Sequence, residues 1–199
     1  MLREQFDDLL QGESFWTRTG LGSSHAYAPA TAGYTLTATG TDGFFADLGG
    51  ASEAWTAYRL NLRLELEGAN HAASVWVLMT TEGDRDASYQ VDLDGLASEV
   101  RIIRLDAGTP TTLATATGIT IAAGYGYDWS IEAEAGGAST SIRVYQDGLL
   151  RASAVDSSGS RKAAGGVAWA GENAAAQVSL HHALAFAMGT TNTRIGPHP

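Results

Sequence analysis

The stretch YRLNLRLELE, residues 58–67, alternates strictly between apolar and polar side chains after its first residue. In a β-strand its leucines would share one face and the polar residues between them would share the other. An α-helix would instead scatter the leucines around its circumference. The stretch therefore predicts a strand with one buried and one solvated face, in which the core positions are Leu60, Leu62, Leu64 and Leu66.

The same period of two recurs along the chain, at 89–94, 127–134, 142–145 and 178–186. The run SVWVLMTT at 74–81 is apolar on both faces, which predicts a central or covered strand. The run EVRIIRLD breaks phase at Ile102–Ile103, where we expect a β-bulge. Turn signals such as DAGTP and QDG separate the runs at short intervals. Roughly a dozen short strands predict an all-β sandwich or barrel, and the first ten or so residues are the one stretch that fits either a helix or a strand.

The chain has 199 residues, of which 44% are hydrophobic and 17% are charged. This length suits one sizeable domain, and nothing in the sequence resembles a linker between two domains. We therefore expect a single domain over residues 1–188. Residues 189–199, GTTNTRIGPHP, lack hydrophobic periodicity and contain two prolines, so we expect them to form a C-terminal tail.

Acidic residues outnumber basic residues by 22 to 12, which gives a net charge of −10. We therefore expect neither nucleic acid nor an anionic membrane surface as a partner. The absence of cysteine excludes disulfides, thiolate metal sites and a cysteine nucleophile. No apolar run approaches the ~20 residues that cross a bilayer, and the first residues lack the apolar region of a signal peptide.

The order of these elements resembles that of the concanavalin A-like lectin/glucanase jelly roll in its laminin-G-like form. The most characteristic piece is IRVYQDGLLRASAVDS at 142–157, which is followed by a Gly-Gly-Val strand at 165–167. The resemblance extends from about Phe6 to Met188 and implies a two-sheet antiparallel jelly-roll sandwich. Lectins, carbohydrate-binding modules, glycoside hydrolases, polysaccharide lyases and adhesion modules all use this fold, so the fold does not decide the function.

Retaining glucanases of this fold place paired carboxylates on one strand in an E-x-D-x-E pattern, and the sequence lacks that pattern. Glu65/Glu67 and Glu132/Glu134 have only the i, i+2 spacing, and we interpret both pairs as solvated strand faces. The R-x-E-L fragment of the fold's lyases occurs at 63–66 without their Q-I-H signature. We therefore expect no enzyme activity and assign no catalytic residue. A hydrolase or lyase with an unfamiliar catalytic pair is the less favoured alternative.

Metal ligands are not evident in the sequence. His181 and His182 are adjacent on an expected strand, so their side chains would point to opposite faces and could not share one ion. The face of His182 is apolar, which is typical of a core histidine. The acidic loops DRD at 84–86 and DLDG at 92–95 offer oxygen ligands for calcium, which laminin-G-like domains often hold at a rim. Because Asp-Gly is also a common hairpin turn, we expect no metal or cofactor and keep calcium as the alternative.

Aromatic residues give the remaining indication of a site, because sugar rings stack on exposed tryptophan or tyrosine. Trp76 lies out of phase with Val75, Val77 and Met79, and Tyr145 lies out of phase with Ile142 and Val144, beside Arg143. We expect Trp76, Arg143 and Tyr145 to form a carbohydrate-binding platform on one sheet. The alternative is that a loop or second layer covers Trp76, since Leu78 would share its face. The tryptophans that we expect in the core are Trp55, Trp129 and Trp169.

These observations favour a non-enzymatic module that binds cell-surface polysaccharide as part of a phage-like virion, such as a tail fibre, receptor-binding protein or head spike. Small-residue-rich strands, the lack of cysteine and the C-terminal tail motivate the virion prediction. The chain would be made in the cytoplasm without a signal peptide and would act in a virion or extracellular particle. Its partners would be the polysaccharide, other virion proteins and further copies in a homo-oligomer. The alternative is a purely structural virion subunit that binds no sugar.

Overall fold

The structure, a computed structural model, describes residues 2–5, 24–28, 33–37, 55–69, 71–80, 85–172 and 177–188. These residues form thirteen strands and contain no helix. The strands are β1 (Leu2–Gln5), β2 (Ser24–Ala28), β3 (Gly33–Thr37), β4 (Ala57–Glu67), β5 (Ala72–Met79), β6 (Ala87–Asp94), β7 (Glu99–Asp106), β8 (Thr109–Thr117), β9 (Gly126–Gly136), β10 (Ser139–Gln146), β11 (Leu149–Asp156), β12 (Gly166–Glu172) and β13 (Gln177–Ala187).

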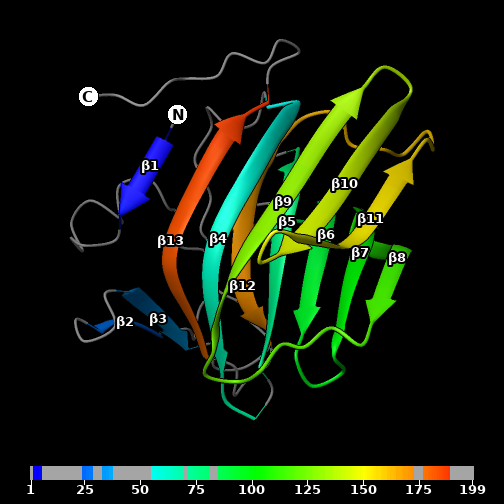
Figure 1. Cartoon of the computed structure of the whole chain (residues 1–199). Coiled ribbons are helices and arrows are strands. Elements are labelled where there is room, and N and C mark those ends of the chain that lie inside the picture. Colours follow the sequence, from blue (N-terminus) through cyan, green and yellow to red (C-terminus); the bar gives the residue numbers. More distant parts are fainter. Residues whose placement is uncertain are drawn as a thin grey trace.

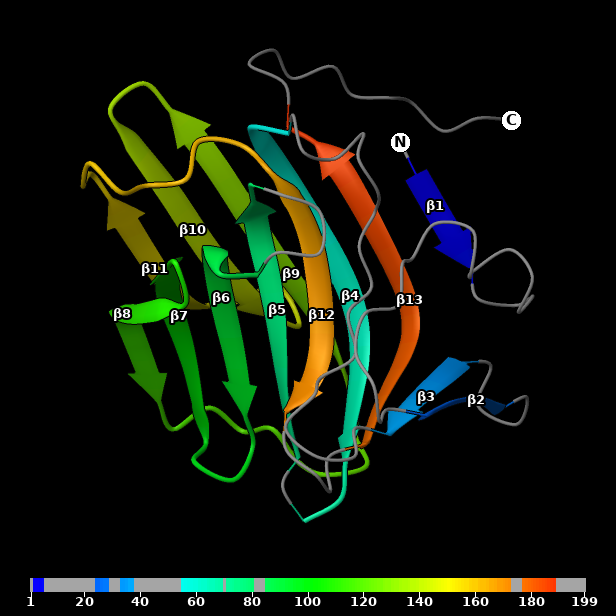
Figure 2. The ribbon, with the colours of Figure 1, turned by 180° about the vertical axis from the view of Figure 1, so that it is seen from behind.

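The strands form two sheets that pack face to face (Figures 1 and 2). The eight-stranded sheet has the order β11-β10-β9-β4-β13-β3-β2, with β1 paired to β13, and the five-stranded sheet has the order β12-β5-β6-β7-β8. The pairs are antiparallel. The predicted two-sheet antiparallel jelly-roll sandwich is confirmed. The first residues form a strand, whereas the tail at 189–199 and the side chains of His181 and His182 lie outside the described part of the chain.

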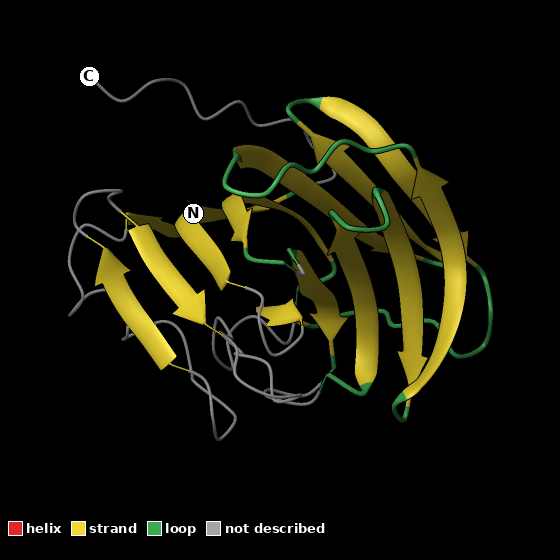
Figure 3. Ribbon diagram, turned by 90° about the horizontal axis from the view of Figure 1, so that it is seen from below, coloured by secondary structure: helices red, strands yellow, loops and turns green. Residues whose placement is uncertain are grey.

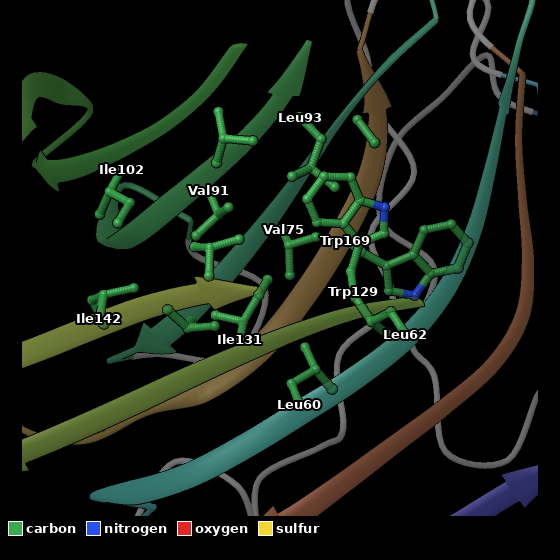
Figure 4. Close-up of a cluster of buried hydrophobic side chains, with 14 of the residues drawn as sticks. Leu60, Leu62, Val75, Val91, Leu93, Ile102, Trp129, Ile131, Ile142 and Trp169 are labelled. Carbon is green, nitrogen blue, oxygen red and sulfur yellow. The ribbon is translucent and has the colours of Figure 1, made fainter. Parts of the chain in front are cut away.

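The core lies between the sheets, and β4 contributes its leucines to it. Leu60, Leu62, Leu64 and Leu66 are all buried there, as predicted from the alternation. They face apolar side chains of the five-stranded sheet, and Figure 4 shows Trp129 of β9 and Trp169 of β12 directed into the same space. Trp55 is half-buried and packs against this core. The interior is therefore built from the apolar faces of strands with period two, as in other β-sandwiches.

Strand β5 changes phase near its end, which the sequence pattern did not predict. Leu78 has a φ of 52°, and the pairing with β12 shifts register between Gly166 and Val167. As a result Leu78 turns into the core, whereas Met79 joins Trp76 on the outer face. The expectation that Met79 shares the core face and Leu78 the outer face is wrong, because one irregular residue reverses the alternation after it.

The hydroxyl of Tyr58 joins the two sheets at this irregular point. It accepts a hydrogen bond from the backbone N–H of Leu78 at 2.7 Å and donates one to the carbonyl oxygen of Gly166 at 3.1 Å. Tyr58 belongs to β4, so its buried side chain reaches across the core from one sheet to the other. The polar groups that the irregularity frees are thereby satisfied inside the sandwich.

The predicted bulge at Ile102–Ile103 is confirmed, because the pairing of β7 with β8 shifts register at that point. The extra residue lies on β8, where Leu113 has no partner between Ala114 and Thr112. Two of the predicted turns are also present, at Ala107–Gly108 and Asp147–Gly148, and both of their residues have positive φ. That conformation matches the twist of the flanking strands and joins them tightly.

Alternating strand directions give the sandwich two ends with different connections (Figures 1 and 3). The upper end holds the turns at 107–108 and 137–138 and the loop at 157–165. The lower end holds the turns at 95–98 and 147–148, the β4–β5 connection and the loop at 118–125. In the described residues no helix is long and apolar enough to cross a membrane.

A buried carboxylate organises the upper end. Asp156 accepts hydrogen bonds from the Tyr89 hydroxyl at 2.8 Å, from Arg104 at 3.2 Å and from the backbone N–H of Ser158 at 2.9 Å. Burial alone would raise the pKa of Asp156, but these bonds outweigh it and lower the pKa to about 2. Burial and the bond to Asp156 raise the pKa of Tyr89, so its hydroxyl stays a donor.

A second carboxylate extends this network to the chain's one lysine. Asp106 accepts hydrogen bonds from Arg104 at 2.8 Å and from Lys162 at 2.7 Å. The hydroxyl of Thr140 in turn donates to the carbonyl oxygen of Lys162 at 2.8 Å. Strands β7, β10 and β11 and the loop at 157–165 are thus fastened together at the upper end.

Candidate functional site

The three predicted site residues lie on different sheets. Trp76 belongs to β5 in the five-stranded sheet, whereas Arg143 and Tyr145 belong to β10 in the eight-stranded sheet. Each is out of phase with the core residues of its strand. Trp76 therefore lies on the outer face of the five-stranded sheet, whereas Arg143 and Tyr145 lie on the outer face of the eight-stranded sheet. The prediction of a single platform that contains all three residues is therefore wrong.

Trp76 is also not open to a ligand, because only 2% of it is exposed. It belongs to a second apolar cluster on the outer face of the five-stranded sheet, whose other members are Met79, Ile103, Leu105, Ala168 and Ala170. The guanidinium group of Arg85 lies 5.9 Å from the centre of its ring. The alternative interpretation of Trp76 as a covered residue is the one that the burial supports.

Polar residues beside this cluster satisfy one another. Asp92 is buried and accepts hydrogen bonds from the Ser74 hydroxyl at 2.7 Å and from the Gln90 amide at 2.6 Å. Its other oxygen pairs with Arg101 at 3.1 Å. A calcium ion in the loop at 92–95 would need the carboxylate of Asp92 as a ligand, and both oxygens of that carboxylate already have these partners.

The neighbouring Asp94 accepts a hydrogen bond from the backbone N–H of Ala97, which closes the turn at 95–98. Within the described ranges no group of three or more histidine or acidic side chains could hold a metal ion. Asp84 of the other acidic loop lies outside those ranges.

The outer face of the eight-stranded sheet carries a cluster formed by Arg59, Glu132, Arg143 and Tyr145, which we name the arginine–tyrosine cluster. Strands β4, β9 and β10 are neighbours, and their register places Arg59 and Arg143 on either side of Glu132. Glu132 forms an ion pair with Arg59 and accepts hydrogen bonds from Tyr145 at 3.1 Å and Arg143 at 3.4 Å. The guanidinium group of Arg59 lies 5.9 Å from the centre of the Tyr145 ring. Period-two alternation on three adjacent strands thus gathers four polar side chains at one point.

Glu132 holds the cluster together as a buried anion. Glu132 is 7% exposed, and burial alone would raise its pKa. The hydrogen bonds from Arg59, Tyr145 and Arg143 outweigh burial and lower the pKa of Glu132 below its ordinary value. Burial, together with the hydrogen bond to Glu132, raises the pKa of Tyr145. The carboxylate therefore stays ionised and fixes the positions of two guanidinium groups and a tyrosine ring.

The two arginine side chains remain accessible to a ligand from solvent. The side chain of Arg59 is 47% exposed and that of Arg143 is 42% exposed. Each guanidinium group has five N–H donors, and Glu132 uses only part of this capacity. The cluster consequently presents fixed donors beside a half-buried aromatic ring.

The pair Glu132/Glu134 does not have the features of a glycosidase pair. Glu134 is exposed and lies 3.8 Å from Arg143, whereas Glu132 is held as an ion by three donors. A general acid of a glycosidase needs a raised pKa, and the pKa of Glu132 is lowered instead. This geometry favours a binding role for the cluster.

Sequence reasoning missed one exposed aromatic residue, Tyr125 in the loop at 118–125. It is 60% exposed, and its ring lies 4.8 Å from that of Tyr127. Tyr125 shares the phase of Tyr127 and Trp129, so the period predicts a core position for it. The signal that could have found it is the pair of flanking glycines, Gly124 and Gly126, which mark a loop before β9 begins at Gly126.

No family model matches the sequence, and neither does any curated protein. Solved structures do share the fold. A carbohydrate-binding module of family 66 from Bacillus subtilis is 16% identical over 83% of this chain and 92% of its own, with a TM-score of 0.61. A protein with a galectin-like fold from Bacillus subtilis is 7% identical over 94% of this chain and 95% of its own, with a TM-score of 0.67. A legume lectin-like domain from Entamoeba histolytica is 10% identical over 94% of this chain and 97% of its own, with a TM-score of 0.64.

These similarities show that the chain has the jelly-roll sandwich of galectins and legume lectins. At such low identities they carry no residue of a binding site over to this chain, because one fold hosts many functions. The site has to be argued from its own side chains.

Proposed function

We propose that the chain is a non-catalytic carbohydrate-binding module whose site is the arginine–tyrosine cluster. The observation that carries this proposal is the fixed arrangement of Arg59, Arg143 and Tyr145 around the buried carboxylate of Glu132. Binding sites for small ligands combine an apolar or aromatic surface with a few fixed polar groups. The solved structures that share the fold include a carbohydrate-binding module from Bacillus subtilis, which agrees with this proposal.

The chemistry of the cluster suits sugars. Guanidinium N–H groups donate to hydroxyl oxygens, and the ring of Tyr145 offers an apolar surface to the C–H groups of a pyranose. Because Glu132 already orients both arginines, little side-chain entropy is lost when a ligand binds. The cluster lies on an open sheet face, where water competes for the same hydrogen bonds. A few such contacts therefore give each single site a weak affinity for its sugar.

Substitutions in the cluster test this proposal. We expect Tyr145→Ala and Arg143→Ala each to weaken binding to glycans on an array by about fivefold, because each removes a contact worth roughly 1 kcal/mol. Thr115→Ala, on exposed strand β8 of the other sheet, is the matched control and should bind like the parent. Equal binding by all three folded variants would refute the site.

The finer proposal is that several copies act together on a phage-like particle, alongside other virion proteins, and attach it to cell-surface polysaccharide. Weak single sites become effective when many copies bind one surface. The virion setting is supported by the sequence features alone. Deleting the domain from its particle should abolish attachment to host cells, whereas unchanged attachment would refute this setting.

A structural subunit is the second candidate, and the exposed residues of β11 favour it. Leu149, Leu150 and Val155 are all exposed on this strand, which lies at the edge of the eight-stranded sheet. Exposed apolar residues on a sheet edge are typical of contacts between chains. Replacing Val155 with Lys should dissociate such an assembly in sedimentation velocity while leaving glycan binding unchanged.

A further inference from the structure

The lower end of the sandwich collects exposed apolar side chains. Among the described residues five large hydrophobic side chains are exposed, and the one outside this end is Val155. The other four lie in or next to the turns of the lower end, and they are Leu96, Tyr125, Leu149 and Leu150. Tyr125 is the aromatic member of this set.

The ring of Tyr125 rests on a rigid support. The backbone N–H of Gly124 donates to the carbonyl oxygen of Leu66 at 2.8 Å, which ties the loop to the end of β4. The backbone N–H of Ala122 donates to the hydroxyl of Tyr127 at 3.2 Å, beneath the same loop. The rings of Tyr125 and Tyr127 are in contact, with an interplanar angle of 56°. The free surface of Tyr125 is therefore held in place before any ligand arrives.

The approach to this ring is open. A Cβ atom added at Gly124, where φ is 70°, would meet no atom within 4 Å. On the other side, a Cβ atom added at Gly126 would lie 3.4 Å from the guanidinium nitrogens of Arg63. The Gly124 side of Tyr125 is therefore free of neighbouring atoms, whereas the Arg63 guanidinium group borders the Gly126 side.

Polar groups lie next to Tyr125 along the chain, around Gly126 and the start of β9, where the guanidinium group of Arg63 borders Gly126. Arg63 pairs with Asp128 at 3.1 Å, and both side chains are largely exposed. Two hydrogen bonds join Asp147 to Asp128. The backbone N–H of Asp147 donates to the carbonyl oxygen of Asp128 at 2.8 Å, and the backbone N–H of Asp128 donates to the carboxylate of Asp147 at 3.0 Å. Arg63 neutralises one of the two carboxylates, so the group keeps a negative charge.

We propose that Tyr125, with Arg63, Asp128 and Asp147, forms a second saccharide site that selects neutral over acidic sugars. The inference rests on the proposed carbohydrate-binding function and adds the ligand class of a separate site. A pyranose would place its C–H face on the exposed surface of Tyr125, while its hydroxyl groups bond the flanking arginine and carboxylates. A uronic acid would be repelled by the unpaired charge of the carboxylates.

The two sites are far enough apart to be observed separately. Tyr145 lies opposite Ser130 on β9, and Tyr125 precedes Ser130 by five residues. At about 3.3 Å per strand residue, this spacing corresponds to roughly 16 Å. Backbone amide signals of 124–126 and of 143–145 therefore report on different sites.

The experiment is a titration of the ¹⁵N-labelled protein with neutral hexasaccharides of glucose, mannose and xylose and with hexagalacturonate. We expect at least one neutral probe to shift the amide signals of residues 124–126. Hexagalacturonate should bind there with an affinity at least about tenfold lower, measured from the same signals. Tyr125→Ala should weaken the neutral response by about tenfold, and Tyr125→Phe should keep it, because the ring makes the contact. Leu96→Ala, another exposed residue of the lower end, is the matched control and should respond like the parent.

Each outcome separates the two proposals. Shifts confined to 143–145 would overturn the second site and leave the arginine–tyrosine cluster standing. Shifts confined to residues 124–126 would overturn the arginine–tyrosine cluster as a binding site and leave the second site standing. The second site is overturned if the response at residues 124–126 survives Tyr125→Ala, or if it is as strong with hexagalacturonate as with a neutral probe. It is also overturned if the signals of the parent protein at these residues respond to no neutral probe.

Discussion

At Gly165 the backbone enters β12 with a φ of 153°, and its N–H donates to the carbonyl oxygen of Trp55 at 3.0 Å. A Cβ atom at this position would lie 2.1 Å from the carbonyl oxygen of Met79 and 2.4 Å from the carbonyl carbon of Leu78. Both neighbours are backbone atoms of a buried strand, so they cannot move aside cheaply. Glycine is required here by space and by conformation together.

We expect Gly165→Ala to lower the free energy of unfolding by about 2–3 kcal/mol, because the strained backbone and the displaced neighbour both cost energy. Urea unfolding followed by tryptophan fluorescence measures this. Gly159→Ala is the matched control, since its Cβ would meet no atom within 4 Å. A loss below about 1 kcal/mol for Gly165→Ala would mean that the close approach does not exist.

Asp156 makes the stability depend on acid. Its pKa is about 2 in the folded state, below the ordinary value of 3.8 that applies when the chain is unfolded. Stability from this group is therefore complete above about pH 4 and is lost as the pH falls through 2. The difference in pKa corresponds to about 2 kcal/mol. Urea unfolding at pH 6 and pH 2.5 should show most of this loss.

Asp156→Asn is the variant that tests the assignment, because it keeps the shape and cannot ionise. It should be less stable than the parent at pH 6 and should lose less stability between pH 6 and pH 2.5. Asp106, whose pKa is lowered chiefly by its hydrogen bond with Lys162, adds a smaller loss of the same sign. An unchanged pH dependence in Asp156→Asn would show that other carboxylates cause the acid sensitivity.

Among the strands whose side chains the structure describes, β4 contributes five residues to the core, Tyr58, Leu60, Leu62, Leu64 and Leu66. Leu64→Ala should lower the free energy of unfolding by about 2–5 kcal/mol, since the side chain is buried and its removal leaves a cavity. Arg63→Ala, on the opposite face of the same strand, should cost less than about 1 kcal/mol because its ion pair is exposed. Similar losses for both variants in urea unfolding would place Leu64 outside the core.

The alternation of β4 and β9 was sufficient to predict the fold, because each strand has one buried face. Strand β5 was harder to interpret, because all of its residues are buried and its pattern has no polar face. The phase reversal at Leu78 depends on a backbone angle that no residue type in the run announces. Local periodicity therefore predicted the strands well and one of their irregularities, the shift at Ile102–Ile103.

Only part of the candidate site could be predicted, for a related reason. The phase of Arg143 and Tyr145 correctly put them on an outer face, but phase does not tell which sheet a strand joins. Trp76 was consequently grouped with them although it lies on the opposite side. Glu132 and Arg59 come together with Tyr145 through pairings between strands that are distant in sequence, and a local pattern does not contain that information.

For the molecule as a whole, the shallow cluster predicts weak binding by one copy and strong binding by many. One domain should bind its glycan at roughly 0.1–1 mM, whereas four copies on streptavidin should bind a glycan-coated surface about 10²–10⁴ times more tightly. Biolayer interferometry on both forms measures the ratio. Tetramers of Tyr145→Ala serve as the control, and a gain as large in that control would point to non-specific adhesion.

The order of the eight-stranded sheet also determines when the chain can finish folding. In the described part of the chain, β1 pairs with β13, and the hairpin of β2 and β3 joins the rest of the sheet through β13. Strand β1 and the β2–β3 hairpin thus wait for β13 before they can join the rest of the sheet. Closing such long loops is slow, so we expect a ribosome-bound chain to keep its first strands undocked until β13 has left the exit tunnel. Completion of the sheet therefore waits for β13, with the early strands open to chaperones until then.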